Sequence, residues 1–362
     1  MAKARWKSTV ILLRAAFEVL THEFPMTIRQ LFYRLVSVRV IENCNADYRR
    51  VSSVMTTARE QNEVPWEWIC DRSRPSYSRS SWTSLEDYGE VVANAYRKDY
   101  WQTQSRHLLI LVEKDAIVGS IQPVADKYGV TIRTLRGFSS ATVAHEIAAE
   151  FRELEHAGKQ IHVLYLGDYD PSGEAIERDV AERIEQFMAV DMGKATQISF
   201  REMRRAKLLA RLGSWELLQK FEDRCWEIEN RTGGGHDEIL TRLVCRHLKL
   251  NPKTACLPFL LRRLAIHPED IRKFNLPPLR VKLADPRASG FLRKHGNECV
   301  ELDALPPSEL RRRLSAAIRG LIDKAAWERA MAVEEAERAT TRKVAKAFRD
   351  LSGTLEVSAD VT

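Results

Sequence analysis

The chain has 362 residues, which is long enough for two or three domains that each bury a core. Apolar residues make up 44% and charged residues 30%, a globular composition that excludes intrinsic disorder. The longest purely apolar run, Leu108–Val112, is too short to cross a membrane, so no membrane partner is expected. Basic residues exceed acidic ones by only 57 to 50, so charge alone leaves nucleic acid open as a partner.

The first hundred residues, 1–100, predict a helical domain. Lys7–Thr21 is amphipathic, and a second helix is expected to begin at Thr27, where Gln30 gives the spacing of a capping box. A third helix is expected after Asn45. Residues 63–82, rich in proline, serine and aromatic residues, predict a β-wing followed by a loop. Three short helices and a wing are typical of a winged-helix domain, a variant of the DNA-binding helix-turn-helix.

Residues 101–350 predict a second, α/β domain. Apolar strands are expected at 107–112, 130–135, 161–166 and 258–266, with helices after the first three, and this alternation indicates a parallel sheet. The charged segment 191–256 is expected to be a helical insertion that serves dimerisation, a partner or DNA contact. A long C-terminal helix is expected to begin near residue 301 and to end in a frayed tail, 351–362.

Acidic residues follow two of the expected strands. Glu113 ends the first strand, and Asp168 and Asp170 lie just past the third. Because residues two apart in an extended segment project to the same side, both aspartates can face one point, and neighbouring strands would bring Glu113 to it. Three converging carboxylates need a hard cation, and Mg²⁺ prefers oxygen ligands. The alternative is that these residues only cap the following helices.

The segments that hold these acids carry a family resemblance over residues 107–187. VEKDA, RGFSS and LGDYDPSGE resemble the Toprim domain of topoisomerases, primases and some nucleases. In that family the glutamate after the first strand and the Asp-x-Asp after a later strand hold Mg²⁺. The resemblance therefore implies that Glu113, Asp168 and Asp170 are metal ligands.

A tyrosine on the second expected helix is a candidate nucleophile. Leu31, Phe32 and Leu35 share the apolar face of this helix, and Tyr33 is expected on the polar side with Arg29. A phenol has a pKa near 10, so a neighbouring cation or base has to activate it before it can attack a phosphodiester. The alternative is a packing tyrosine or a phosphate contact.

The order of these motifs resembles the A subunit of topoisomerase VI and its relative, the meiotic double-strand-break transesterase. In those proteins an arginine precedes a tyrosine pair by the interval that separates Arg29 from Tyr33, and the second tyrosine forms a 5′-phosphotyrosyl link. Phe32 replaces the first tyrosine, which is a departure from the pattern. RLAIHPEDIRKFNLP and VELDALPP also resemble bacterial and phage members. The resemblance implies a homodimer in which each tyrosine works at the partner's metal site.

Three functions remain open. The leading hypothesis is Mg²⁺-dependent cleavage of double-stranded DNA by transesterification, with Tyr33 as nucleophile, Arg29 beside it, and Glu113 able to relay a proton. The others are a hydrolytic Toprim nuclease and a non-catalytic DNA-binding protein. Arg49, Arg50 and Arg59, on the third helix, are candidate DNA contacts alongside Arg29, or else a solvated face.

Two motifs that the sequence lacks bear on its expected partners and location in the cell. The sequence holds no Gly-rich nucleotide-binding loop, so ATP-driven strand passage would need a separate ATPase B-like subunit. Its six cysteines are scattered without a Cys-x-x-Cys pair, which favours reduced thiols over disulfides or zinc. A cytoplasmic, nucleoid-associated protein is therefore expected.

Overall fold

The computed structural model describes residues 7–70, 80–135, 141–192, 208–209, 212–232, 236–248 and 259–352. The strands are β1 (Arg106–Val112), β2 (Thr131–Thr134), β3 (Gln160–Leu166), β4 (Leu260–Ala265), β5 (Leu279–Arg280) and β6 (Glu298–Cys299). The helices of the first half are α1 (Lys7–Glu23), α2 (Ile28–Ser37), α3 (Asn45–Glu60), η1 (Trp66–Trp68), α4 (Leu85–Ala95), α5 (Asp115–Tyr128), α6 (Ala141–His156) and α7 (Pro171–Met192). Those of the second half are α9 (Trp215–Thr232), α10 (His236–Leu248), α11 (Pro268–Lys273), α12 (Ala288–His295), η2 (Leu302–Ala304), α13 (Pro307–Arg319) and α14 (Lys324–Ser352).

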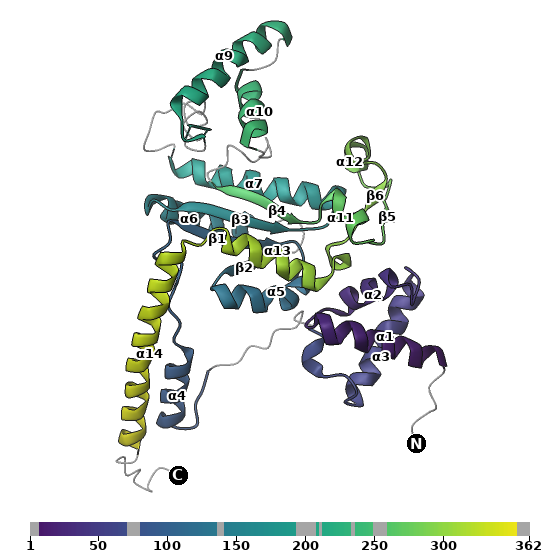
Figure 1. Cartoon of the computed structure of the whole chain (residues 1–362), viewed down its shortest axis with the longest axis vertical. Helices are drawn as coiled ribbons and strands as arrows, with labels where there is room; N and C mark the ends of the chain where they lie inside the picture. The colour runs from purple at the N-terminus through teal and green to yellow at the C-terminus, as the bar shows by residue number, and fades with distance from the viewer. Residues whose placement is uncertain are drawn as a thin grey trace.

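Four strands form a parallel sheet in the order β2-β1-β3-β4, which confirms the expected parallel α/β architecture. Helices α6 and α7 lie on one face of this sheet, and α5 and α13 on the other (Figure 1). Successive residues of β1 alternate between the two faces: Leu109 packs with α6 and α7, whereas Ile110 packs with α5 and α13. Both faces are covered, which explains why the two central strands, β1 and β3, are mainly apolar and buried.

Helices α1, α2 and α3 pack on one another near the end of the sheet at which the strands finish (Figure 1). The expected capping box at the start of α2 is confirmed: Gln30 N donates to Thr27 Oγ1 at 3.0 Å, and Thr27 N donates to Gln30 Oε1 at 2.8 Å. Buried residues of all three helices belong to the same apolar core as β1, α5 and α13. The N-terminal helices are therefore fixed against the sheet domain.

The expected β-wing is not seen in the described part of residues 61–84. This part contains the turn η1 and a single bridge between Met26 and Ile69, but no strand. Residues 71–79, in the middle of the expected wing, lie outside the described residues. The triple-helical unit is thus established, whereas a winged-helix fold is not.

The expected long C-terminal helix is instead two helices. Gly320 ends α13, and Asp323 starts α14 by accepting a hydrogen bond from Ala326 N at 3.0 Å. Helix α14 packs lengthwise on α4, and together they form an arm that leads away from the sheet (Figure 1). The tail after Ser352 lies outside the described residues.

The described part of the expected insertion, 191–256, is helical. Helices α9 and α10 pack on each other around a small apolar core of their own, which includes Leu218 and Val244. This pair lies on the α7 side of the sheet (Figure 1). No helix among the described residues is long and apolar enough to span a membrane.

Candidate active site at the sheet edge

Strand order brings Glu113 and Asp168 into contact. Val112 pairs with Leu166 in the parallel ladder, so the residues that follow β1 and β3 leave the sheet at the same edge. The backbone N–H of Asp168 donates to Glu113 Oε2 at 2.9 Å, and Glu113 N donates to Leu166 O at 3.0 Å. Both acidic side chains are buried, with residue exposures of 6% and 5%.

Asp170 faces the start of α7. Its Oδ1 accepts a hydrogen bond from Gly173 N at 2.6 Å, which is the role of a helix cap. Gly173 permits this tight turn, because a Cβ there would lie 2.3 Å from the carbonyl oxygen of Asp168 and 3.2 Å from Glu113 Oε2. The glycine therefore lets the first turn of α7 approach the two buried acids.

Lys114 lies among carboxylates that come from distant parts of the chain. Its Nζ is 2.7 Å from Asp168 Oδ2, 3.6 Å from Asp303 Oδ2 and 3.7 Å from Glu301 Oε2. The second oxygen of Asp168 accepts from Leu302 N at 2.7 Å. We call Glu113, Asp168, Glu301 and Asp303 the acidic cluster.

Burial governs the protonation of this cluster. Desolvation, together with the charge of Asp168, raises the pKa of Glu113 to about 7. Desolvation also raises the pKa of Asp303 to about 6, although Lys114 opposes this shift. Burial by itself lowers the pKa of Lys114, but the surrounding carboxylates outweigh it and keep the ammonium charged. A buried oxygen, Asp303 Oδ2, has no hydrogen-bond partner among the described residues. The cluster therefore has more negative charge than one lysine compensates.

Tyr33 is not on an exposed polar face, contrary to the expectation. Only 5% of it is exposed, because η2 and the residues before it cover the side of α2 that the helical pattern marks as polar. Burial first, and then the charge of Glu301 and a hydrogen bond to it, raise the pKa of the Tyr33 phenol well above its usual range. Arg29 Nη1 binds the same carboxylate, with 2.8 Å between Nη1 and Glu301 Oε2. Tyr33 and Arg29 thus both meet the acidic cluster at Glu301.

Among the three candidate DNA contacts on α3, only Arg49 is exposed. Arg50 Nη2 donates to the carbonyl oxygen of Ser8 at 2.8 Å, which ties α3 to α1. The guanidinium of Arg59 lies over the ring of Trp66, 4.2 Å from its centroid. Two of these arginines therefore have structural partners.

Arg263, on β4, holds the loop that carries the aspartates. Its Nη1 donates to the carbonyl oxygens of Gly167 and Asp168 at 3.1 and 3.0 Å, and its Nε pairs with Glu177 Oε2 at 2.8 Å. Its guanidinium also lies over the ring of Tyr165, 5.0 Å from the centroid. Because this guanidinium binds two successive carbonyls, it fixes the backbone on both sides of the Asp168 amide.

Sequence reasoning missed four members of this site: Lys114, Arg263, Glu301 and Asp303. A signal for two of them existed, since Glu301 and Asp303 repeat the acid-x-acid spacing of residues 168 and 170. An antiparallel bridge between Tyr169 and Val300 places these two segments side by side. RGFSS, residues 136–140, lies outside the described residues.

The carboxylate oxygens at the sheet edge suit a hard cation, although in this structure the ammonium group of Lys114 lies among them. No group of three or more Asp, Glu, His or Cys side chains in the described ranges is arranged to hold a metal ion. Asp168 is turned toward Lys114, and Asp170 toward the Gly173 amide. The raised pKa of Glu113, and the Asp303 oxygen that accepts no hydrogen bond from any described residue, nonetheless fit a site that gains from further positive charge.

Comparisons of the chain with protein-family models, with curated proteins and with solved structures find no match. The function has to be argued from the chemistry of the site.

Proposed function

We propose that this protein cleaves double-stranded DNA in a Mg²⁺-dependent reaction in which Tyr33 becomes linked to the 5′-phosphate. In this proposal α1–α3 form a winged-helix unit, and the parallel sheet is a Toprim domain of the topoisomerase VI A type. The observation that carries it is one connected set of contacts: Tyr33 meets Glu301, Glu301 meets Lys114, and Lys114 meets Asp168. A candidate nucleophile and the acids at the sheet edge thus belong to one site.

Glu113, Asp168 and Asp170 are the proposed ligands of Mg²⁺. When bound, the ion would supply charge stabilisation for the phosphate. Binding would displace the proton of Glu113, whose pKa is about 7, so the affinity for the ion would increase as pH rises through 7. Lys114 would then release Asp168 and remain close enough to bind a phosphate oxygen.

The chain's own residues account for the rest of the reaction. Tyr33 transfers its phenolic proton to Glu301, the carboxylate to which it is hydrogen-bonded. The phenolate oxygen then forms a bond to phosphorus, the bond from phosphorus to the 3′-oxygen breaks, and that oxygen takes a proton from solvent. Arg29, which pairs with Glu301 in the free protein, stabilises the phenolate and the charged phosphate.

Burial of Tyr33 favours a second candidate, a hydrolytic nuclease in which activated water replaces the tyrosine. With 5% of Tyr33 exposed and the pKa of its phenol raised, attack requires α2 to separate from η2 when DNA binds. A hydrolytic reaction requires no such separation. It predicts free 5′-phosphate ends and no protein trapped on DNA.

The test is a plasmid cleavage assay with Mg²⁺, stopped with detergent and divided into samples with and without protease. We expect the wild-type protein to leave 5′ ends blocked by protein, and Tyr33→Phe to leave no covalent product. Tyr48→Phe is the matched control, since Tyr48 packs edge-on against Phe32 in the same helical unit and should keep full activity. If Tyr33→Phe cuts at the wild-type rate, the hydrolytic candidate is correct. If no protein cuts and DNA binding is independent of Mg²⁺, the chain is a non-catalytic DNA-binding protein.

Assembly is part of the proposal. A homodimer would place two sites on the two strands of a duplex, and light scattering measures whether the chain is dimeric. The proposal differs here from the resemblance, which implies that each tyrosine works at the partner's metal site, because Tyr33 is linked to the acids of its own chain through Glu301. A separate ATPase subunit is proposed only for strand passage, and cleavage should not require ATP. The proposed substrate places the protein at the nucleoid in the cytoplasm.

A further inference from the structure

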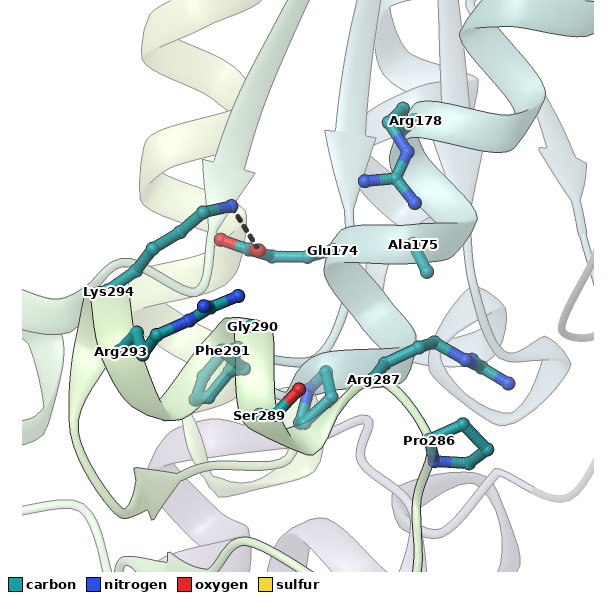
Figure 2. Close-up of a pocket in the computed structure, with 11 residues that line it drawn as sticks. Glu174, Ala175, Arg178, Pro286, Arg287, Ser289, Gly290, Phe291, Arg293 and Lys294 are labelled. Carbon is teal, nitrogen blue, oxygen red and sulfur yellow. Dashed lines mark ion pairs between the residues drawn. The ribbon is translucent and has the colours of Figure 1, made fainter.

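A basic cavity lies between α7 and α12, beside the candidate active site. Its volume is about 260 Å³, and Figure 2 shows the side chains around it. Arg178 extends from α7, and Arg293 and Lys294 extend from α12 (Figure 2). Arg287 is the residue directly before α12. None of these four residues belongs to the acidic cluster.

The cavity has an excess of positive charge. Glu174 is the one acidic residue in its lining, and it is already engaged by Lys294 at 3.7 Å and by His295 at 2.5 Å. The Arg293 side chain has no ion pair or hydrogen bond with any residue that the structure describes, and the Arg178 side chain has only an exposed ion pair with Glu182 at 3.8 Å. At least two guanidinium groups are therefore available to an anion.

Its chemistry favours a phosphate over a nucleobase. A base needs an aromatic face on which to stack, but the ring of Phe291 is buried and packs against Tyr169 and His295, with centroids 5.2 and 4.8 Å away. A cavity of about 260 Å³ is also smaller than the pockets that usually enclose drug-sized ligands, roughly 300–1,000 Å³. The planar guanidinium group of arginine can donate two parallel hydrogen bonds, which match the geometry of two phosphate oxygens.

The turn between β3 and α7 joins this cavity to the active site. Asp170 caps α7, and Pro171, the next residue, lines the cavity. Ser172 Oγ donates to Asp285 Oδ2 at 3.2 Å and accepts from Arg287 Nη1 at 3.3 Å, which ties the cavity wall to the same turn. The N-terminus of α7 adds positive potential here. The cavity and the turn that carries Asp170 therefore share one short stretch of backbone.

We propose that this cavity binds a non-reacting phosphate of the DNA backbone and so sets which phosphate reaches Tyr33. The proposal rests on the proposed function for its substrate. Arg178 and Arg293 are positioning residues that fix the strand and take no part in the bond changes.

The experiment measures binding of a fluorescent duplex by anisotropy in EDTA, so that no cleavage occurs, over a series of salt concentrations. Each lost phosphate contact lowers the slope of log K against log salt by about 0.9. We expect the double variant Arg178→Ala/Arg293→Ala to lose about 2 from this slope for each protomer bound, and roughly tenfold in affinity per contact at low salt. Arg329→Ala, which removes an exposed arginine from α14, is the control and should leave the slope unchanged.

The cleavage assay supplies a second readout. In wild-type protein a defined duplex should be cut at one or a few positions, whereas the double variant should spread the cuts over neighbouring phosphates. An unchanged slope and an unchanged cleavage pattern would refute the proposal, even if Tyr33→Phe abolishes the covalent product. If inorganic phosphate raises the Tm of wild type but not of the variant while the DNA slope stays unchanged, the cavity holds a free anion and the DNA proposal is wrong. Loss of covalent product in Tyr33→Phe tests the proposed function separately.

Discussion

Replacing Lys114 with methionine tests whether this lysine is the counter-charge of the acidic cluster. Methionine keeps much of the length of the side chain and removes the ammonium that lies 2.7 Å from Asp168 and 3.6 Å from Asp303. The side chains of these two acids are only 7% and 1% exposed, so water replaces little of the lost interaction. The variant would therefore leave buried carboxylates without their cation.

Breaking a buried pair by removing one partner costs about 3–5 kcal/mol. Two effects reduce this cost: the Lys114 side chain is 30% exposed, and protonation of the acids removes part of their unpaired charge. We therefore expect the free energy of unfolding to fall by about 2–4 kcal/mol at pH 8. The loss should shrink toward pH 5. Burial already raises the pKa of Asp303 to about 6, and removal of the lysine raises it further. An acid whose folded-state pKa is raised lowers stability progressively as pH rises from its unfolded-state pKa, 3.8, to its folded-state pKa, so the penalty is smaller at pH 5 than at pH 8.

The assay is urea unfolding followed by circular dichroism at both pH values, first in EDTA and then with MgCl₂. If Mg²⁺ binds these carboxylates, it should restore more stability to Lys114→Met than to the wild-type protein. Lys127→Met removes an exposed lysine from α5 and should change stability by no more than about 0.5 kcal/mol. Equal stability of Lys114→Met and wild type at pH 8 in EDTA would refute the argument.

Two further variants test the framework of the site. Gly173→Ala should abolish cleavage and lower the Tm, because the new Cβ would lie 2.3 Å from the Asp168 carbonyl oxygen. Gly320→Ala is the control and should retain activity, because a Cβ there would meet no atom closer than 3.5 Å. Arg313→Ala should cost about 3–5 kcal/mol in urea unfolding, since it leaves the buried Asp270 unpaired. Arg312→Ala, whose side chain is 63% exposed, should cost about 1 kcal/mol or less; equal losses for both arginines would contradict this reasoning.

The elements that local pattern determines were predictable from the sequence. Apolar runs predicted all four parallel strands, three of them with a helix to follow, and the Thr27–Gln30 spacing predicted how α2 begins. Because neighbouring parallel strands end at the same edge of a sheet, the sequence also predicted that Glu113 and Asp168 lie together there, and the Asp168 backbone N–H donates a hydrogen bond to Glu113. The C-terminal region was predicted less well, because the helical pattern continues on both sides of Gly320 and the prediction did not place the end of a helix at this glycine.

Features that depend on contacts between distant segments were not predictable. The helical pattern of α2 identified its polar side, but a pattern within ten residues does not reveal that η2 covers Tyr33 there. Lys114 was visible beside Glu113, yet its partners Glu301 and Asp303 lie almost two hundred residues further along the chain. Spacing within a segment predicts which side chains share a direction, whereas only the tertiary fold decides what they meet.

The hydrogen bond between Thr27 and Asp303 joins residues 276 positions apart. Glu113 and Asp168 are synthesised long before Glu301 and Asp303. A nascent or prematurely terminated polypeptide therefore lacks Glu301, the proposed proton acceptor of Tyr33. In the proposed reaction this order of synthesis is a safeguard, because ribosome-bound and truncated products carry Tyr33 but lack its proton acceptor. By the proposed route, the chain could cleave DNA only after translation had passed Asp303 and η2 had packed against α2.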